Sequence, residues 1–158
     1  MHQPCKDPLE RFVEQCRDHN LRVTPQRTAV YEELMSAANH PSAELVYHRV
    51  REKLRHISFD TVNRTLLKFA EISLIGTVEG SGEPRRFDPD TSRHDHVICS
   101  RCGRIVDLAP PAADDPPVPP EIRRRYLVTN RRVVFRGTCE ACQADQKPQG
   151  RRTSARIR

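Results

Sequence analysis

The chain has 158 residues, of which 36% are hydrophobic and none is Trp, so it can form one ordinary domain or two small ones but no large core. Its net charge of +6 and its pI near 9.3 favour a polyanionic partner, nucleic acid first. No stretch approaches the ~20 apolar residues of a membrane span, and no secretory signal is present, so we expect a cytoplasmic protein without a membrane partner.

Four short helices are predicted in the first 70 residues. The first covers residues 8–19, Thr24 and Ser42 are N-caps of the second and third, and the fourth begins near Ser58. Their expected core residues are Leu9, Phe12, Val13 and Cys16; Ala29, Val30, Leu34 and Ala37; Val46, Val50 and Leu54; and Val62, Leu66 and Phe69. Cys16 is thereby interpreted as a core residue, and Cys5 as part of a loose N-terminus.

A β-hairpin is predicted after the fourth helix, with strands at residues 74–78 and 85–87 around a Gly-rich turn. Short helices followed by a hairpin are typical of a winged helix, whose last helix enters the major groove of DNA. The outward face of that helix carries Thr61, Asn63, Arg64 and Lys68. These polar residues could form an ordinary solvated face, but together with the net charge they favour DNA contact.

The second half is predicted to contain short strands at residues 96–98, 104–108 and 126–135. Six prolines lie between residues 110 and 120, so any helix there should be short and late, around residues 121–125. Residues 146–158 carry Lys147 and four arginines with almost nothing apolar, which predicts a basic disordered tail. The domain boundary is expected near residues 88–93.

Two CxxC pairs, Cys99 with Cys102 and Cys139 with Cys142, predict a structural zinc site. Four soft thiolates form a closed tetrahedral shell that suits Zn²⁺ and excludes hard cations. The alternative is a pair of disulfides, which a reducing cytosol disfavours.

His94 and His96 alternate along a predicted strand, so both imidazoles can face a second metal ion. Two histidines alone are a weak signal, because surface histidines on a strand are the commoner case. A second site therefore needs ligands from elsewhere in the chain.

The chain resembles the ferric uptake regulator (Fur) family from about Leu9 to Cys142. The resemblance is carried by residues 21–27 (LRVTPQR), 40–44 (HPSAE), 61–66 (TVNRTL), Phe87-Asp88, the stretch from His94 through Asp107, and the closing CxxC. It implies an α+β protein with a winged-helix DNA-binding domain at residues 1–90, a zinc-containing α/β dimerisation domain at 91–145, and the tail at 146–158.

What the resemblance implies for function is a homodimeric transcriptional repressor, not an enzyme, that binds double-stranded DNA at a pseudo-palindromic operator. The regulatory metal, Fe²⁺ or Mn²⁺, is expected at the domain junction on His40, Asp88, His94, His96 and Asp107. Residues expected to contact DNA are Arg22, Thr61, Asn63, Arg64 and Lys68. One ion bound by both domains could switch the repressor, since ~1–3 kcal/mol of coupling is typical of allostery.

Position 107 is Asp rather than Glu, and in this respect the chain resembles the peroxide-sensing (PerR) branch of the family. In that branch oxidation falls on histidine ligands, here His40 and His94. The alternatives are an iron, zinc or manganese uptake repressor of the same family, a metal-dependent hydrolase, and a zinc-ribbon module without DNA. The last leaves the helices and hairpin unexplained.

Three positions depart from the family pattern. Asn63 stands where Tyr is usual, which is expected to alter DNA recognition without excluding it, because Asn can bond adenine. Ser73 replaces a usual Gly after the last helix and is expected to shift that corner slightly. The proline-rich segment 110–120 replaces much of the usual dimerisation helix, so we expect a reduced dimer contact.

Overall fold

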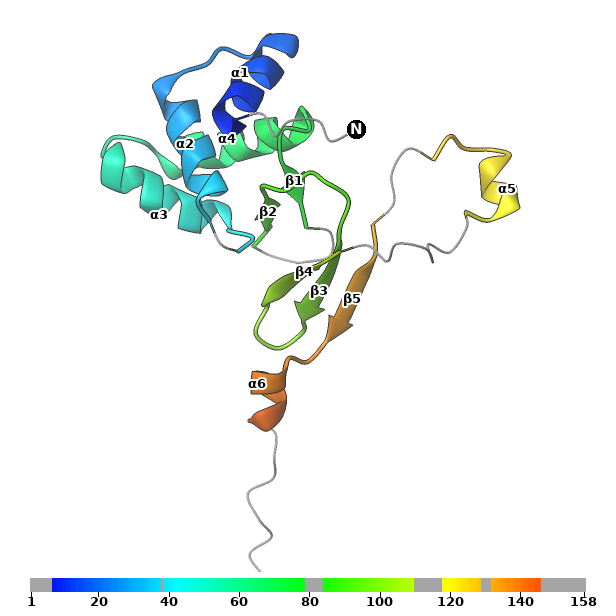
Figure 1. Cartoon of the computed structure of the whole chain (residues 1–158). Coiled ribbons are helices and arrows are strands. Elements are labelled where there is room, and N and C mark those ends of the chain that lie inside the picture. The colour runs from blue at the N-terminus through cyan, green and yellow to red at the C-terminus, as the bar shows by residue number, and fades with distance from the viewer. Residues whose placement is uncertain (1–6, 38, 79–83, 110–117, 129–131, 146–158) are drawn as a thin grey trace, which may run out of the picture.

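The computed structural model describes residues 7–37, 39–78, 84–109, 118–128 and 132–145. Its elements run, in chain order, through four helices, a small hairpin, two strands of a sheet, a short helix, the third strand of that sheet and a last short helix (Figure 1). The described residues up to Asp88 are called the N-terminal half below, and those from Pro89 onward the C-terminal half. The predicted tail and the loose N-terminus with Cys5 lie outside the described residues.

The four predicted helices are all confirmed. They are α1 (Pro8–Asp18), α2 (Pro25–Met35), α3 (Ala43–Lys53) and α4 (Phe59–Glu71). The side chains of Thr24, Ser42 and Ser58 each accept a hydrogen bond from a backbone N–H in the first turn of the helix that follows. These caps satisfy donors that the helix itself leaves unpaired, which is why the helices begin where the sequence predicts.

The core of the N-terminal half lies between these helices. Phe12, Tyr31 and Phe69 form its aromatic centre, with ring centroids 4.8 to 6.2 Å apart. Cys16 is fully buried among them, as predicted, and its burial raises the pKa of the thiol. Two expected core residues differ: Leu9 is exposed in the first turn of α1, and Ala37 lies past the end of α2 and is only half-buried.

The hairpin consists of β1 (Gly76–Thr77) paired antiparallel with β2 (Phe87–Asp88). It is shorter than predicted, because Leu74 and Ile75 pack into the helical core instead of the ladder. The second strand is fastened to the loop before α3, where the Phe87 N–H donates to the Pro41 carbonyl at 2.9 Å. This contact brings Asp88 close to His40.

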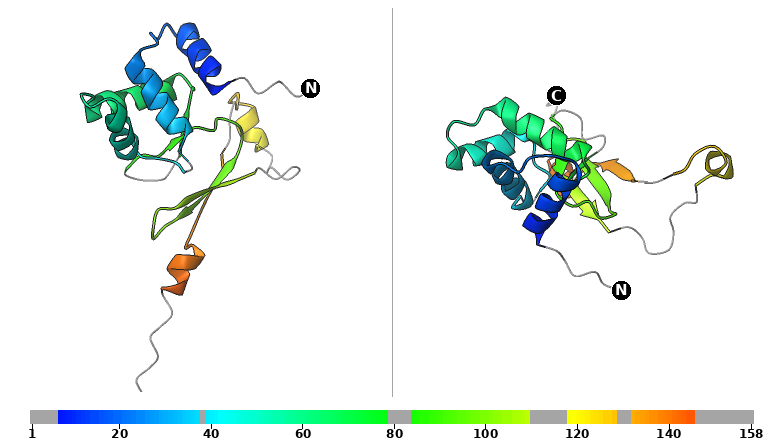
Figure 2. Two further views of the ribbon diagram at one scale, coloured as in Figure 1. Left: turned by 60° about the vertical axis from the view of Figure 1, so that its left-hand side comes forward. Right: turned by 90° about the horizontal axis from the view of Figure 1, so that it is seen from above.

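The C-terminal half is a three-stranded sheet in the order β4-β3-β5. Strand β3 (Asp95–Cys99) pairs antiparallel with β4 (Ile105–Leu108) and parallel with β5 (Val134–Gly137). The short helix α5 (Pro120–Arg123) lies on the connection to β5 and stands apart from the sheet (Figures 1 and 2). A small apolar cluster of Ile98 and Ile105 with Val134 forms the core of this half, and Val78 of the N-terminal half packs into it.

One prediction for this half is wrong, and one element was not predicted. The third strand was expected at residues 126–135, but residues 126–128 form no strand and are exposed, and β5 begins only at Val134. Because β5 runs parallel to β3, the chain must first return to the end of the sheet where β3 begins. The residues that make this return have a strand-like sequence but cannot pair. A further helix, α6 (Glu140–Ala144), was not predicted and begins directly after Cys139.

Among the described residues, no helix is both long and apolar enough to cross a bilayer. The proline-rich segment lies largely outside those residues, so the expectation of a reduced dimer contact stays a prediction.

The corner after α4 generates a stability prediction. Ser73 has φ 57°, the left-handed conformation that favours glycine at the end of a helix. We expect Ser73→Gly to raise the free energy of unfolding by about 0.5–1 kcal/mol, since relief of the Cβ strain exceeds the extra entropy of glycine in the unfolded chain. Chemical denaturation measures the change. Ser73→Ala retains the Cβ and is the control; an equal gain from Ala would contradict the strain argument.

Candidate metal centres

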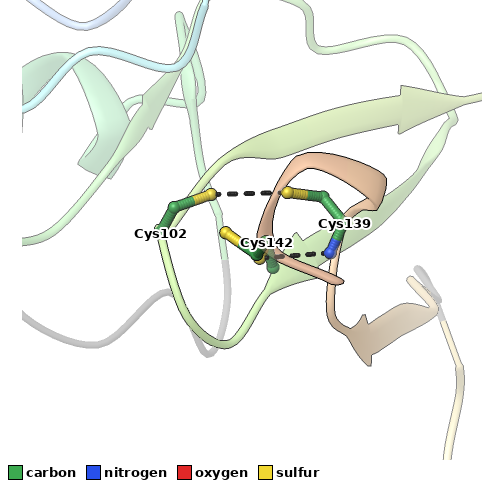
Figure 3. Close-up of side chains that lie close together, drawn as sticks. Cys102, Cys139 and Cys142 are labelled. Carbon is green, nitrogen blue, oxygen red and sulfur yellow. Dashed lines mark hydrogen bonds between the residues drawn. The ribbon is translucent and has the colours of Figure 1, made fainter. Parts of the chain in front are cut away.

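The four predicted zinc ligands converge at one end of the sheet (Figure 3). Cys99 ends β3 and Cys102 lies in the turn to β4, where Gly103 adopts a positive φ of 70°. Cys139 is the N-cap of α6 and Cys142 lies within that helix. The two pairs are therefore held by a hairpin turn and a helix start rather than by two similar turns.

The sulfur geometry fits one tetrahedral ion. All four Sγ atoms lie within 4.8 Å of one another, and those of Cys102 and Cys139 are 3.8 Å apart. Sulfurs bound to zinc at about 2.3 Å in a tetrahedron are separated by about 3.8 Å. A disulfide needs about 2.05 Å, and the described cysteines are all free, so the disulfide alternative finds no support.

The surroundings of Cys99 favour a thiolate even without metal. Backbone N–H groups of Cys139, Cys102 and Arg101 point at its sulfur, the first at 3.4 Å, and lower the pKa of Cys99 to about 5. Hydrogen bonds within the cluster and burial raise the pKa of Cys142 to about 12. Four thiolates cannot coexist at this distance without a cation, and a divalent ion removes that conflict.

A second centre forms where the two halves meet. His40 comes from the loop before α3 and Asp88 from β2. His94 lies just before β3, His96 lies in β3, and Asp107 lies in β4. The ligand atoms of His40, His94, His96 and Asp107 all lie within 4.8 Å of one another. All five residues expected for the regulatory metal are thus brought together.

The distances at this centre are those of ligands that share an ion. The Nε2 atom of His96 is 3.0 Å from Nε2 of His94 and 3.2 Å from Nε2 of His40. Asp107 Oδ1 lies 3.0 Å from His40 Nε2, and Asp88 Oδ2 lies 3.0 Å from His94 Nε2. Neighbouring donors bound at about 2.1 Å are about 3.0 Å apart in an octahedron and about 3.4 Å apart in a tetrahedron.

The hydrogen bonding around the centre leaves lone pairs that could bind a cation. His94 Nδ1 lies 3.0 Å from the Ser92 carbonyl, which can only accept, so Nδ1 carries the proton and Nε2 presents a lone pair. Asp88 is 1% exposed, and its Oδ2 has no hydrogen-bond donor among the described residues. Oδ1 of the same carboxylate accepts a hydrogen bond from the Asp90 N–H at 2.9 Å, so Oδ2 is the oxygen that a bound metal would satisfy.

Burial also favours the neutral form of the His96 imidazole. His96 is fully buried, and desolvation together with the neighbouring His40 and His94 lowers its pKa. A neutral imidazole is the form that binds metal. Asp107 is the exception in exposure, with 53% of its side chain accessible, so solvent reaches the centre along this ligand.

The residues expected to contact DNA lie on or near α4. Val62, Leu66 and Phe69 are buried as predicted. Arg64 is exposed and lies 3.8 Å from Asp60, whereas Lys68 is held by Glu71 at 2.7 Å. The charges of this face are therefore partly neutralised within the helix, by ion pairs of the weak surface kind.

The remaining three differ in exposure. Arg22 is exposed in the loop before α2, and Thr61 is half-buried with its hydroxyl 2.9 Å from that of Ser58. Asn63 is half-buried in a groove with Tyr47, Phe59 and Phe87. The position that departs from the family pattern thus sits beside aromatic side chains.

Several contacts around the second centre had no signal in the sequence. Arg11 on α1 donates to the Thr91 hydroxyl in the linker between the halves. Arg132, just before β5, donates to the Thr77 carbonyl of β1 at 3.3 Å. Each joins residues more than 50 positions apart, which local patterns do not encode.

Comparison with known proteins agrees with this geometry. A model of the ferric uptake regulator family matches residues 18–118. The peroxide-responsive repressor PerR of Staphylococcus epidermidis is 31% identical over 137 residues, 87% of this chain and 91% of the relative. That of Staphylococcus saprophyticus is 32% identical over 135 residues, 85% of this chain and 91% of the relative.

Among solved structures, the ferric uptake regulator Fur of Helicobacter pylori, described as having three functional metal binding sites, is similar with a TM-score of 0.66 and 25% identity. The match covers 86% of this chain and 91% of that one. The family model spans more than half of the chain, and the relatives exceed 30% identity over most of it. The chain therefore belongs to the ferric uptake regulator family.

Proposed function

We propose that the chain is a metal-dependent transcriptional repressor that binds double-stranded DNA as a homodimer and responds to peroxide. The observation that carries the proposal is the convergence of five ligands, two from the N-terminal half and three from the C-terminal half. An ion bound by both sets restrains the angle between the halves. In a dimer it thereby restrains the spacing of two recognition helices, which must match successive major grooves.

The organisation that goes with this function has three parts. Residues 1–90 are the DNA-binding domain, 91–145 the dimerisation domain, and 146–158 a basic tail. The helical apolar cluster supports the first division, because all its buried residues lie between Phe12 and Phe87. The family consists of transcriptional regulators, so the chain is not an enzyme. A cytoplasmic location and a pseudo-palindromic operator follow from that role.

The two centres suit different metals. The four-cysteine cluster suits structural zinc, because its shell is closed and soft. The three imidazoles and two carboxylates form a borderline-to-hard set that suits Fe²⁺ or Mn²⁺ as the regulatory ion. Bound Fe²⁺ would supply the electrons for reducing peroxide, which Mn²⁺ does far less readily.

Peroxide as the signal is supported by the relatives and by the exposure of the site. The curated relatives at 31% and 32% identity are both named peroxide-responsive repressors. Asp107 is the half-exposed ligand, so a small polar oxidant has access on its side, next to His40 at 3.0 Å. His40 and His94 are the residues we propose to be oxidised.

Iron uptake control is the second candidate, with zinc or manganese uptake behind it. It is favoured by the likeness to the Helicobacter pylori Fur, whose TM-score is 0.66. Oxidation of ligands after peroxide separates the two candidates.

The first prediction tests the zinc assignment. Cys99→Ser should release zinc and destabilise the C-terminal half, because a three-thiolate shell loses closure and structural zinc contributes roughly 10–16 kcal/mol of apparent binding energy. Zinc per chain is measured by elemental analysis, and the oligomeric state by light scattering. Cys16→Ser is the control: it should keep zinc and lose only core stability. A Cys99→Ser protein that stays dimeric with one tightly bound zinc would contradict the assignment.

The second prediction tests DNA recognition by α4. Arg64→Ala should weaken binding to an operator selected in vitro by about 1–3 kcal/mol and affect random DNA much less, since Arg64 is exposed on the outward face. Arg17→Ala removes the same charge from α1 and is the control. Removal of residues 147–158 should instead lower affinity for all sequences and reduce the salt dependence. Equal losses on operator and random DNA would argue against a recognition role for Arg64.

The third prediction tests the signal. Peroxide should abolish DNA binding by the iron-loaded protein and add oxygen at His40 or His94, whereas the manganese-loaded protein should resist. Asp107→Glu should keep metal-dependent DNA binding and blunt the peroxide response, because its longer side chain fills the accessible side of the centre. Peptide mass spectrometry and a DNA mobility shift provide the readouts. If the iron-loaded protein kept full DNA binding and unmodified histidines after peroxide treatment, the peroxide assignment would be wrong and control of metal uptake would be favoured.

A further inference from the structure

Arg132 joins the C-terminal sheet to the hairpin of the N-terminal half. Its side chain is half-buried, and one guanidinium nitrogen donates to the Thr77 carbonyl of β1 at 3.3 Å. The next residue, Val133, is fixed to β3 at both backbone groups: its N–H donates to Asp95 at 3.0 Å and its carbonyl accepts from the His96 N–H at 3.1 Å. The backbone next to Arg132 is thus hydrogen-bonded to His96, one of the proposed metal ligands.

The other end of this connection lies beside a second metal ligand. Gly76 of β1 is directly opposite Asp88 of β2 in the ladder. Both terminal nitrogens of Arg132 lie 3.3 Å from the point where a Cβ on Gly76 would be, and so does the Cβ of Asp88. The guanidinium therefore packs against the backbone of Gly76, and a Cβ at this position would make a tight contact with it.

The connection does not pass through the position of the ion. It runs from Asp88 across the β1–β2 ladder to Arg132 and through Val133 to His96, so it bridges two ligands that come from different halves. A contact that holds ligands near their bound positions lowers the entropy lost when the ion binds.

We propose that Arg132 is a positioning residue for the regulatory centre and that it holds the hairpin against the C-terminal sheet. The missing side chain of Gly76 leaves the room in which the guanidinium packs. Arg132 touches no ligand of the ion in this role and acts through Asp88 and His96. The inference rests on the proposed function, because it assigns a purpose to the closed arrangement of the two halves. It adds a determinant of metal sensitivity outside the five ligands.

The test is a Mn²⁺ titration of the zinc-loaded full-length chain by calorimetry. Arg132→Ala should weaken Mn²⁺ binding by about three- to tenfold, and Arg132→Lys by less, since Lys retains one donor without the flat guanidinium. Gly76→Ala should give a smaller loss than Arg132→Ala, because its Cβ would lie 3.3 Å from both terminal nitrogens and the guanidinium needs only a small shift. The double variant should lose less than the product of the two single losses, as expected for residues in one contact.

Arg123→Ala is the matched control, since it removes the same charge from exposed α5 and should leave Mn²⁺ binding unchanged. Zinc per chain should stay constant in every variant. An unchanged Mn²⁺ affinity in Arg132→Ala, or losses that multiply fully in the double variant, would overturn the inference.

DNA binding separates positioning from a direct contact with DNA. Arg132→Ala should weaken binding to an in vitro selected operator at limiting Mn²⁺ and recover at saturating Mn²⁺. A loss that persists at saturation with a reduced salt dependence would instead make Arg132 a phosphate contact and reject the proposal. If wild-type protein binds Mn²⁺ but DNA binding ignores the metal, the proposed repressor mechanism fails, while the titration still decides the role of Arg132.

Discussion

The crowding of three imidazoles and two carboxylates at the junction of the halves is the constraint on which the rest of the structure depends. His96 is fully buried and held neutral, and Asp88 is buried with an oxygen that lacks a donor among the described residues. A bound cation would relieve such a cluster, because a buried carboxylate oxygen without a donor is costly. The ligands come from both halves, so the cation that relieves the cluster also joins them.

Strand β3 links this centre to the zinc cluster. His96 lies near one of its ends and Cys99 is its last residue, so one short strand carries ligands of both ions. The apolar core of this half is small, and Val106 and Phe135 remain exposed on the sheet. A four-thiolate shell that ties the β3–β4 turn to α6 compensates for that limited burial. A zinc ion bound there would give the regulatory ligands a rigid support.

The departures from the family pattern acquire physical meaning in the structure. Ser73 keeps the left-handed conformation that a glycine would adopt, so the corner after α4 is retained at the expense of strain. Asn63 lies in a groove beside Tyr47 and Phe59 rather than standing free on the helix surface. A change in operator preference at this position would therefore involve the groove as well as the amide.

The sequence by itself determined what depends on neighbouring residues. The caps at Thr24, Ser42 and Ser58, the buried stripe through Val62 and Phe69, and the two CxxC pairs are local patterns, and the structure confirms the elements and the convergence that they predict. The five-ligand set was implied by family resemblance, since spacing alone singled out only His94 and His96. Tertiary structure decided the rest. It set the start of the parallel strand β5 at Val134, the helix that begins after Cys139, and the packing of Arg132 against Gly76. Each of these requires contacts between distant segments, whose register and approach are set by packing and hydrogen bonding across the fold rather than by the residues next to them.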